Sequence, residues 1–157
     1  MSRRDQIRMT PDEVQAYLAE QKVINVASIG PKGRPHLAPL WYYPYEGGVA
    51  TWTYGSSQKA KNLRRLPEAT VLVESGESYE QLCGVSFEAA VELIDDTPVV
   101  TRMGITLMQR YSGAEPGARP APELEAFVAG QAPKRIGLIF RPTKLTSWDH
   151  RKLAGVY

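Results

Sequence analysis

A short basic segment, residues 55–67 with the sequence GSSQKAKNLRRLP, carries the side chains best suited to binding an anion. Ser56 or Ser57 can cap a short helix there, and Pro67 ends it. Lys59 then falls in the first helical turn, where the helix dipole makes a cation unfavourable by a few tenths to about 1 kcal/mol. A bound anion reverses that cost, because backbone N–H groups, serine hydroxyls and the ammonium all favour negative charge. The segment therefore predicts a phosphate-binding helix.

Helical spacing decides which of these side chains can reach one phosphate. Successive residues are about 100° apart, so Lys59 and Asn62 share a face of the helix that Ser57 caps. Lys61 points about 200° away from Lys59, toward a longer anionic tail, a partner subunit or solvent. The alternative is a basic helix that simply faces water, as most runs of charge do.

The composition argues against several other classes of function. The 157 residues include 19 basic and 17 acidic side chains, and a net charge of +2 does not attract nucleic acid or an acidic membrane. Two histidines and one cysteine do not make a usual zinc site, and no glycine-rich dinucleotide fingerprint follows a strand. The first residues lack an apolar signal segment, and no apolar run reaches about 18 residues. We therefore expect a cytoplasmic protein without a metal.

Periodicity and turn residues predict one mainly β domain over residues 1–157. The sequence TPDE at 10–13 is a capping box that starts a helix over 11–20. Six strands are expected, at 23–29, 35–43, 49–54, 70–74, 82–93 and 135–148. In the clearest of them, at 82–93, Cys83 alternates into the apolar face as a core thiol. Pro142 places the last strand at a sheet edge or bends it, and a tail runs to 157.

An insertion at about 97–130 separates the last two strands. It contains a helix that begins at Thr97, a loop over 112–122 and a short helix over 123–130. An apolar stripe along the first of these helices indicates core or a subunit interface rather than a cofactor site; it consists of Val99, Val100, Met103, Leu107 and Tyr111.

Six short strands joined by hairpin turns favour a small closed or split barrel, since closure removes exposed edges. Three segments resemble the split β-barrel, flavin-binding superfamily of pyridoxamine 5'-phosphate oxidases: GRPHLAPLW at 33–41, ATWTY at 50–54 and SQKAKNLRRLP at 57–67. A weaker likeness continues in LTSWDH at 145–150. Within the superfamily, the chain is most similar to the actinobacterial flavin/deazaflavin oxidoreductases that use coenzyme F420.

The resemblance implies a homodimer that binds a flavin or deazaflavin ring in a groove at the subunit interface. By position, a ring would lie along Ala38, Pro39, Leu40 and Trp41, with backbone groups of that strand at its edge. The floor of the groove would be Thr51, Trp52, Thr53 and Tyr54. The phosphate would bind Ser57, Lys59 and Asn62, and Lys61, Arg64 and Arg65 would meet a charged tail.

The cofactor assignment depends on one departure from the oxidase pattern. The oxidases carry Arg-Lys at the phosphate, whereas this chain has Gln58 and Lys59 and so lacks a bidentate cation. The basic C-terminal substrate motif of the oxidases is also missing. We therefore expect an F420-dependent reductase that delivers a hydride to a planar, electron-poor small molecule. The alternatives are an FMN-dependent oxidoreductase on the same fold and a non-catalytic protein that binds a flavin, deazaflavin or haem.

No side chain is an obvious acid or base, which suits chemistry that a cofactor carries. His36, on a strand beside the groove, and Tyr79, in a polar loop, are weak catalytic candidates. His150 lies in a Trp-Asp-His-Arg cluster that either ties down the C-terminus or reaches a cofactor across the dimer. Trp41, Trp52 and Trp148 could stack on a ring, although core packing is their default role.

Overall fold

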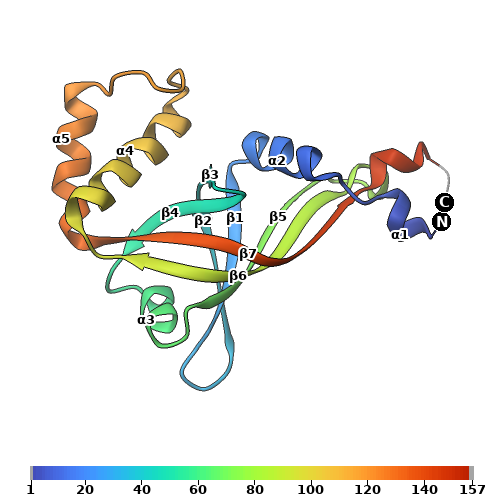
Figure 1. The fold of residues 1–157 in the computed structure, drawn as a ribbon, viewed down its shortest axis with the longest axis horizontal. Coiled ribbons are helices and arrows are strands. Elements are labelled where there is room, and N and C mark those ends of the chain that lie inside the picture. The colour runs from blue at the N-terminus through green and yellow to red at the C-terminus, as the bar shows by residue number, and fades with distance from the viewer. Residues whose placement is uncertain (1, 156–157) are drawn as a thin grey trace.

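The structure is a computed structural model that describes residues 2–155 (Figure 1). The helices are α1 Arg3–Gln6, α2 Pro11–Glu20, α3 Gln58–Arg65, α4 Thr97–Ser112 and α5 Pro122–Gln131, with short 3-10 turns η1 Tyr79–Gln81, η2 Ala132–Lys134 and η3 His150–Leu153. The strands are β1 Val23–Ile29, β2 Pro35–Trp41, β3 Tyr43–Tyr45, β4 Gly48–Tyr54, β5 Glu68–Ser75, β6 Cys83–Ile94 and β7 Arg135–Asp149.

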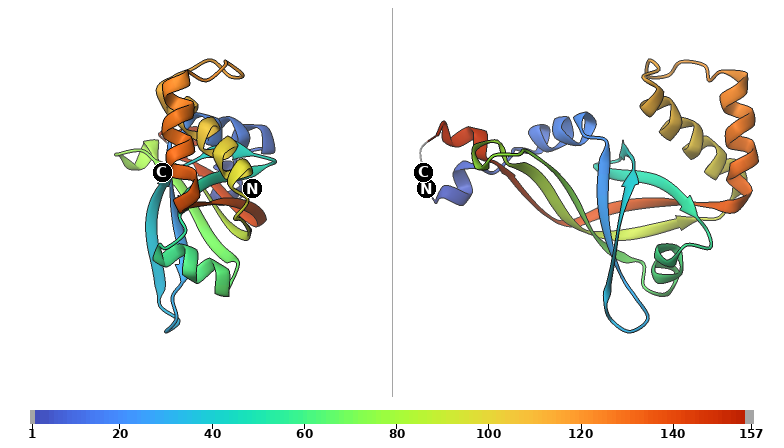
Figure 2. Two further views of the ribbon diagram at one scale, coloured as in Figure 1. Left: turned by 90° about the vertical axis from the view of Figure 1, so that its left-hand side faces the viewer. Right: turned by 180° about the vertical axis from the view of Figure 1, so that it is seen from behind.

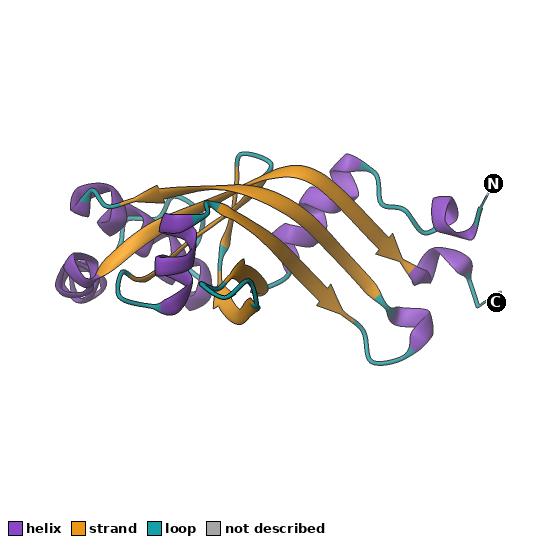
Figure 3. Ribbon diagram, turned by 90° about the horizontal axis from the view of Figure 1, so that it is seen from below, coloured by secondary structure: helices purple, strands orange, loops and turns teal. Residues whose placement is uncertain are grey.

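All seven strands form one antiparallel sheet in the order β2-β1-β5-β6-β7-β4-β3. The sheet curls strongly, and the long strands β5, β6 and β7 bend along their length (Figure 3). The curl turns the sheet into a half-barrel with α3 beneath one end, while α4 and α5 lie together above β4 (Figures 1 and 2). The mainly β fold with flanking helices is therefore confirmed, and the half-barrel is consistent with a split barrel.

The sheet has seven strands rather than the expected six, because the strand expected over 35–43 is interrupted at Tyr42. This side chain is fully buried, and its hydroxyl donates a hydrogen bond to the Leu18 carbonyl at the end of α2. The Tyr42 N–H donates to the Tyr111 hydroxyl instead of to a strand. The chain thus leaves one edge strand, β2, and starts the opposite edge strand, β3, within two residues.

Pro142 lies at a bend in β7. The first half of β7 lies between β6 and β4, and its pairing with β4 ends at Phe140. The register against β6 shifts between Glu88 and Ala89, directly opposite this part of β7. The missing proline N–H therefore falls where β7 loses its second neighbour, and it breaks no ladder in the centre of the sheet.

Two separate apolar clusters lie on the two sides of the curled sheet. The inner cluster fills the half-barrel and contains the alternating residues of β6, including Cys83, Val85 and Phe87, as the sequence predicted. The outer cluster lies between the β4–β7 ribbon and the two helices α4 and α5. Val100, Met103 and Leu107 belong to it, so the apolar stripe of α4 is core.

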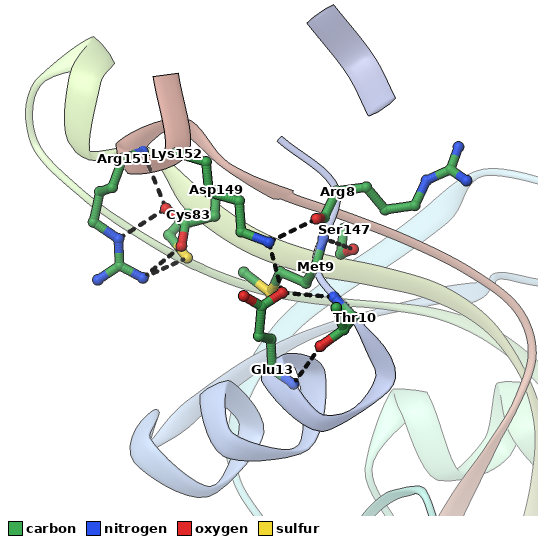
Figure 4. Close-up of polar contacts among 9 residues, drawn as sticks. All are labelled: Arg8, Met9, Thr10, Glu13, Cys83, Ser147, Asp149, Arg151 and Lys152. Atoms are coloured by element: carbon green, nitrogen blue, oxygen red, sulfur yellow. Dashed lines mark hydrogen bonds and ion pairs between the residues drawn. The ribbon is translucent and has the colours of Figure 1, made fainter. Parts of the chain in front are cut away.

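The two chain ends come together at the end of the half-barrel opposite α4 and α5 (Figure 1). Glu13 closes the predicted capping box at the start of α2 and also accepts a 2.6 Å bond from Lys152. Asp149 binds Arg151 through both carboxylate oxygens, at 2.8 and 2.9 Å (Figure 4). Lys152 and Arg151 thus each bind a carboxylate of the same chain.

Candidate functional site

The open seam of the half-barrel, where β2 faces β4, positions most of the residues singled out from the sequence. Thr51 on β4 donates a 2.5 Å hydrogen bond from its hydroxyl to the carbonyl oxygen of Trp41 at the end of β2. This bond joins two strands that lie at nearly opposite places in the strand order. We call this seam the split; it is bordered by Ala38 and Leu40 of β2, Thr51 and Thr53 of β4, and α3.

Lys59 reaches into the split from the first turn of α3. Its ammonium donates a 3.1 Å hydrogen bond to the Thr53 hydroxyl, which is buried. Within residues 2–155 no carboxylate lies within 4.0 Å of the Lys59 ammonium. Burial therefore lowers the pKa of Lys59 below its usual value. The side chain is a half-buried cation whose charge has only a neutral partner.

The start of α3 has the capping that the sequence predicted. Ser57 is the N-cap, and its hydroxyl accepts a 3.3 Å bond from the Ala60 N–H. No acidic residue lies in the first turn, so the remaining amides and Lys59 keep their positive character. Ser57 and Lys59 are therefore together at one helix end, beside Thr53.

Asn62 is also part of α3, but its side chain is fully buried and turned into the fold. Its amide group donates to the Ser28 hydroxyl at 3.0 Å, and its carbonyl oxygen accepts from Gln58 at 2.8 Å. Both ends of the side chain are thus hydrogen-bonded: the amide group attaches α3 to β1, and the carbonyl oxygen is bonded within α3. Asn62 shapes the helix position, and the phosphate site is proposed below without it.

The other basic residues of α3 differ in whether their side chains are bonded within the fold. Arg64 donates to the Gly55 carbonyl at 2.8 Å and pairs with Asp95 at 3.0 Å. Arg65 binds the Ile29 carbonyl. Lys61 is exposed on the face of α3 turned away from Lys59, as helical spacing requires. Lys61 alone of these three therefore projects freely toward whatever lies beyond the helix.

The β2 residues assigned to a ring form a narrow ledge with two faces. Ala38 and Leu40 are half-buried on the inner face, whereas Pro39 and Trp41 are exposed on the outer face. Trp41 stacks flat on Tyr111 of α4, with ring centroids 4.0 Å apart and planes only 5° from parallel. The end of β2 is therefore held against α4 as well as against β4.

The four β4 residues assigned to the groove divide between the two faces of the sheet. Thr51 and Thr53 lie on the inner face, opposite Leu138 and Ile136 of β7. Trp52 and Tyr54 lie on the other face, where Trp52 packs against Gly104 of α4 so closely that a Cβ there would come within 2.4 Å of its ring. Only the threonines therefore border the split directly.

A cavity of about 260 Å³ opens beside the split, under α4 and α5. Its wall combines residues from β2, β4, β7 and both helices: Leu40, Trp41, Thr51, Trp52, Leu107, Met108, Phe127 and Arg135. The Arg135 guanidinium lies over two aromatic rings, 4.5 Å from the Trp52 centroid and 4.1 Å from that of Tyr54. No sequence motif pointed to Arg135 or Phe127, and the α4 stripe indicated core or a subunit interface.

His36 lies on the inner face of β2, opposite Ser28 of β1. The ring is half-buried, and its Nδ1 atom is buried without a hydrogen-bond partner in the described part of the chain. Such an atom has an unmet requirement for a donor or acceptor. His36 therefore stays a candidate at the inner side of the split.

Tyr79 and His150 lie together at the other end of the half-barrel, near the chain termini. The Tyr79 ring meets the His150 ring edge-on, with centroids 4.6 Å apart. Cys83 is buried there, burial raises the pKa of its thiol, and Arg151 contacts its sulfur at 3.5 Å. Within one chain the structure does not bring these residues to the split.

No group of three or more His, Cys, Asp or Glu side chains between residues 2 and 155 is placed to hold a metal ion. No helix over the same residues is both long and apolar enough to cross a membrane.

The fold is a half-barrel, and sequence comparison gives the family to which the chain belongs. The chain belongs to the pyridoxamine 5'-phosphate oxidase family, whose model matches residues 10–148. A crystal structure of the conserved hypothetical protein Rv2991 from Mycobacterium tuberculosis is 34% identical, covers 100% of this chain and 95% of its own, and has a TM-score of 0.88. No curated protein sequence matches the chain.

More distant structures share the fold. An F420 reductase is 18% identical, with a TM-score of 0.62, over 84% of this chain and 94% of its own. HutZ, a haem storage protein from Vibrio cholerae, is 16% identical, with a TM-score of 0.66, over 90% of this chain and 96% of its own. An F420 reductase and a haem storage protein thus share this architecture.

Proposed function

We propose that this protein is an F420-dependent oxidoreductase that transfers a hydride from reduced deazaflavin to a planar, electron-poor small molecule. The observation that carries the proposal is Lys59, a half-buried cation at the start of α3 without a carboxylate partner among the described residues. A fold retains an unpaired, desolvated charge at a cost, so a ligand that supplies the opposite charge is the simplest reason for its position.

The residues at the start of α3 fit a phosphate with one negative charge better than a phosphate with two. Ser57, the first amides of α3 and Lys59 offer one full positive charge and several N–H or O–H donors. Gln58 stands where the oxidase pattern has arginine, and its amide is bonded to Asn62. A phosphodiester, as in F420, carries one negative charge, which this end of α3 can balance. The FMN phosphomonoester carries up to two at neutral pH, and it would leave one unbalanced.

The protein's part in the reaction is binding, orientation and exclusion of water. When bound, reduced F420 supplies a hydride from its ring, and a proton from water or a tyrosine completes the reduction. Ala38 and Leu40 of β2 and Thr53 of β4 would border a flat ring placed beside the Thr51–Trp41 hydrogen bond that joins the two strands. The backbone of β2, an edge strand, has unpaired groups that can bind the ring edge. Lys61 would meet the charged tail from solvent.

The proposed function includes a homodimer with the cofactor at the subunit interface. The outward face of the β1–β2 hairpin exposes apolar side chains that a lone subunit leaves in water: Val23 44%, Ile29 37%, Leu37 68% and Trp41 49% exposed. A shallow hollow of about 450 Å³ continues this face across Ala27 and Thr70 to β6. A contiguous apolar face of this kind is typical of a protein interface, and it borders the split.

The test is a titration of purified, cofactor-free protein with F420 and, separately, with FMN, followed by tryptophan fluorescence. Lys59→Ala should weaken F420 binding by about 1.5–3 kcal/mol, the range for a hydrogen bond to a charged group. Lys32→Ala is the control, since it removes the same charge from an exposed position in the β1–β2 turn, away from the proposed site. We expect it to change the affinity by less than about 0.5 kcal/mol.

Each alternative has its own result in that experiment. Binding of FMN with F420 much weaker would make the protein a flavin-dependent oxidoreductase. Binding of neither, or an F420 affinity indifferent to Lys59→Ala, would overturn the proposal and leave α3 as a basic surface helix. Binding of F420 without electron transfer to any acceptor would support a storage or shielding role.

A further inference from the structure

The cavity under α4 and α5 lies beside the split but has a different chemical character. Its wall is almost wholly aromatic and apolar, with Trp41, Trp52, Met108 and Phe127 contributed by four elements. At about 260 Å³ it is smaller than the roughly 300–1,000 Å³ of pockets that hold drug-sized ligands. A flat molecule of one or two rings matches both its size and its surface.

Arg135 is the one charged residue in that wall. Its guanidinium is fixed over Trp52 and Tyr54, and over residues 2–155 its side chain makes neither a hydrogen bond nor an ion pair. The Nε atom is buried and unpartnered. The other arginines drawn into the fold are bonded, as Arg110 is to four backbone carbonyls. Arg135 is thus a preoriented donor without an acceptor.

The position of Arg135 separates it from the proposed phosphate site. Arg135 pairs with Tyr54, whereas Ile136 pairs with Thr53, the residue that binds Lys59. Neighbouring residues of a strand point to opposite faces, so Arg135 and Lys59 serve opposite faces of the β4–β7 ribbon. One cation is placed for the cofactor side of the split and the other for the aromatic cavity.

We propose that this cavity takes a flat aromatic substrate that bears a carboxylate, and that Arg135 binds the carboxylate while the rings of Trp41 and Trp52 flank the aromatic part. The inference rests on the proposed function, because it names the substrate class of the same site. The aromatic rings hold the Arg135 guanidinium in one orientation. A guanidinium fixed in this way can bind a carboxylate through two parallel N–H···O hydrogen bonds.

The test compares 2-naphthoate with its neutral isostere 2-naphthamide by calorimetry, with cofactor-free protein and with F420-loaded protein. Wild type should bind the acid about tenfold or more tightly than the amide. Arg135→Gln should abolish that preference and leave the amide affinity within about twofold. Lys134→Gln, which removes an exposed charge one residue away, should keep the preference. Arg135→Lys should keep part of it, and thermal denaturation of each variant checks folding.

The outcomes separate this inference from the proposed function and from a second source of the anion. Equal binding of acid and amide by wild type, or a preference that survives in folded Arg135→Gln, would overturn the inference. So would competition between F420 and naphthoate together with an F420 affinity lost in Arg135→Gln, since the carboxylate bound would then be the cofactor's own tail. An Arg135-dependent preference for the acid in a protein that binds no F420 would support the inference while the proposed function fails.

Discussion

The two ends of the half-barrel treat positive charge in opposite ways. Where the chain termini meet, Arg151 binds Asp149 and Lys152 binds Glu13 (Figure 4). At the end that holds α3, α4 and α5 (Figure 1), Lys59 has a neutral hydroxyl as its partner, and Arg135 lies only over aromatic rings. Arg151 is exposed and Lys59 is half-buried, yet among residues 2–155 only the first pair of cations has its counter-charge in the same chain.

The difference indicates which end is finished within one chain and which end awaits a ligand. A cation bonded to a carboxylate contributes to the fold without any further molecule. A desolvated cation without a carboxylate is instead a cost to the fold, which binding of an anion removes. The terminal end thus fastens the two chain ends together, and we propose that the split end is arranged for anionic ligands.

Asn62 lies at the split end, but both polar groups of its side chain already have hydrogen-bond partners inside the fold. It should therefore behave as a structural residue and not as part of the anion site. Asn62→Ala should lower the free energy of unfolding by about 1–3 kcal/mol, since the buried Ser28 hydroxyl loses its donor. Chemical denaturation measures the effect. Gln58→Ala is the control, because it removes only the exposed partner of Asn62 and should cost less than about 0.5 kcal/mol. Equal effects of the two variants would show that Asn62 is not a structural residue.

Asp149 tests whether charge pairing at the terminal end stabilises the fold. Asp149→Asn should cost about 1–2 kcal/mol of unfolding free energy, reduced by the exposure of Arg151, and should leave F420 affinity unchanged. Hydrogen bonding from Arg151 holds the folded-state pKa of Asp149 below its ordinary 3.8. This stability is therefore present above about pH 4 and is lost as the pH falls through the folded-state pKa.

A pair of denaturation series at pH 7 and pH 3 checks this. Wild type should lose more stability on acidification than Asp149→Asn does, because only wild type has this carboxylate to protonate. A variant as stable as wild type at pH 7 would contradict a stabilising role for the pairing.

Lys59 should show the opposite sign at the split end, with the smallest effect. Lys59→Met removes a half-buried charge that has no carboxylate near it among residues 2–155. We therefore expect the free energy of unfolding of the cofactor-free protein to rise by about 0.5 kcal/mol. Thermal denaturation in the presence of F420 should reverse the order, because only wild type is stabilised strongly by the ligand. Loss of stability in the cofactor-free variant would mean that Lys59 serves the fold.

The sequence predicted elements well wherever local signals decide them. The helix over 11–20, with its capping box, and the strand over 23–29 have the bounds that were expected. The strand over 35–43 was too long, because its break depends on Tyr42 bonding to Leu18 and Tyr111, residues remote in sequence. Local patterns contain no information about such contacts.

The residues of the candidate site also fall into two groups, those that local sequence signals reveal and those whose surroundings depend on tertiary contacts. Lys59 and Ser57 were found because helix capping and dipole are properties of consecutive residues. Arg135 could not be found, since its surroundings come from β4, α4 and α5. The phosphate role expected of Asn62 came from helical spacing and from the family resemblance, and neither reveals the β1 strand that its side chain meets. The surroundings of Arg135 and Asn62 are set by tertiary packing, which the spacing of residues along the chain does not reveal.

The most direct test of the account is the pKa of Lys59, measured by NMR of lysine side chains with and without bound F420 and assigned with Lys59→Arg. Burial should hold the pKa of the free protein below the usual 10.5, and a phosphate at the start of α3 should raise it on binding. The affinity should accordingly fall as the pH rises through the free-protein pKa. A pKa that is the same in the free and the bound protein would contradict the claim that Lys59 awaits an anion.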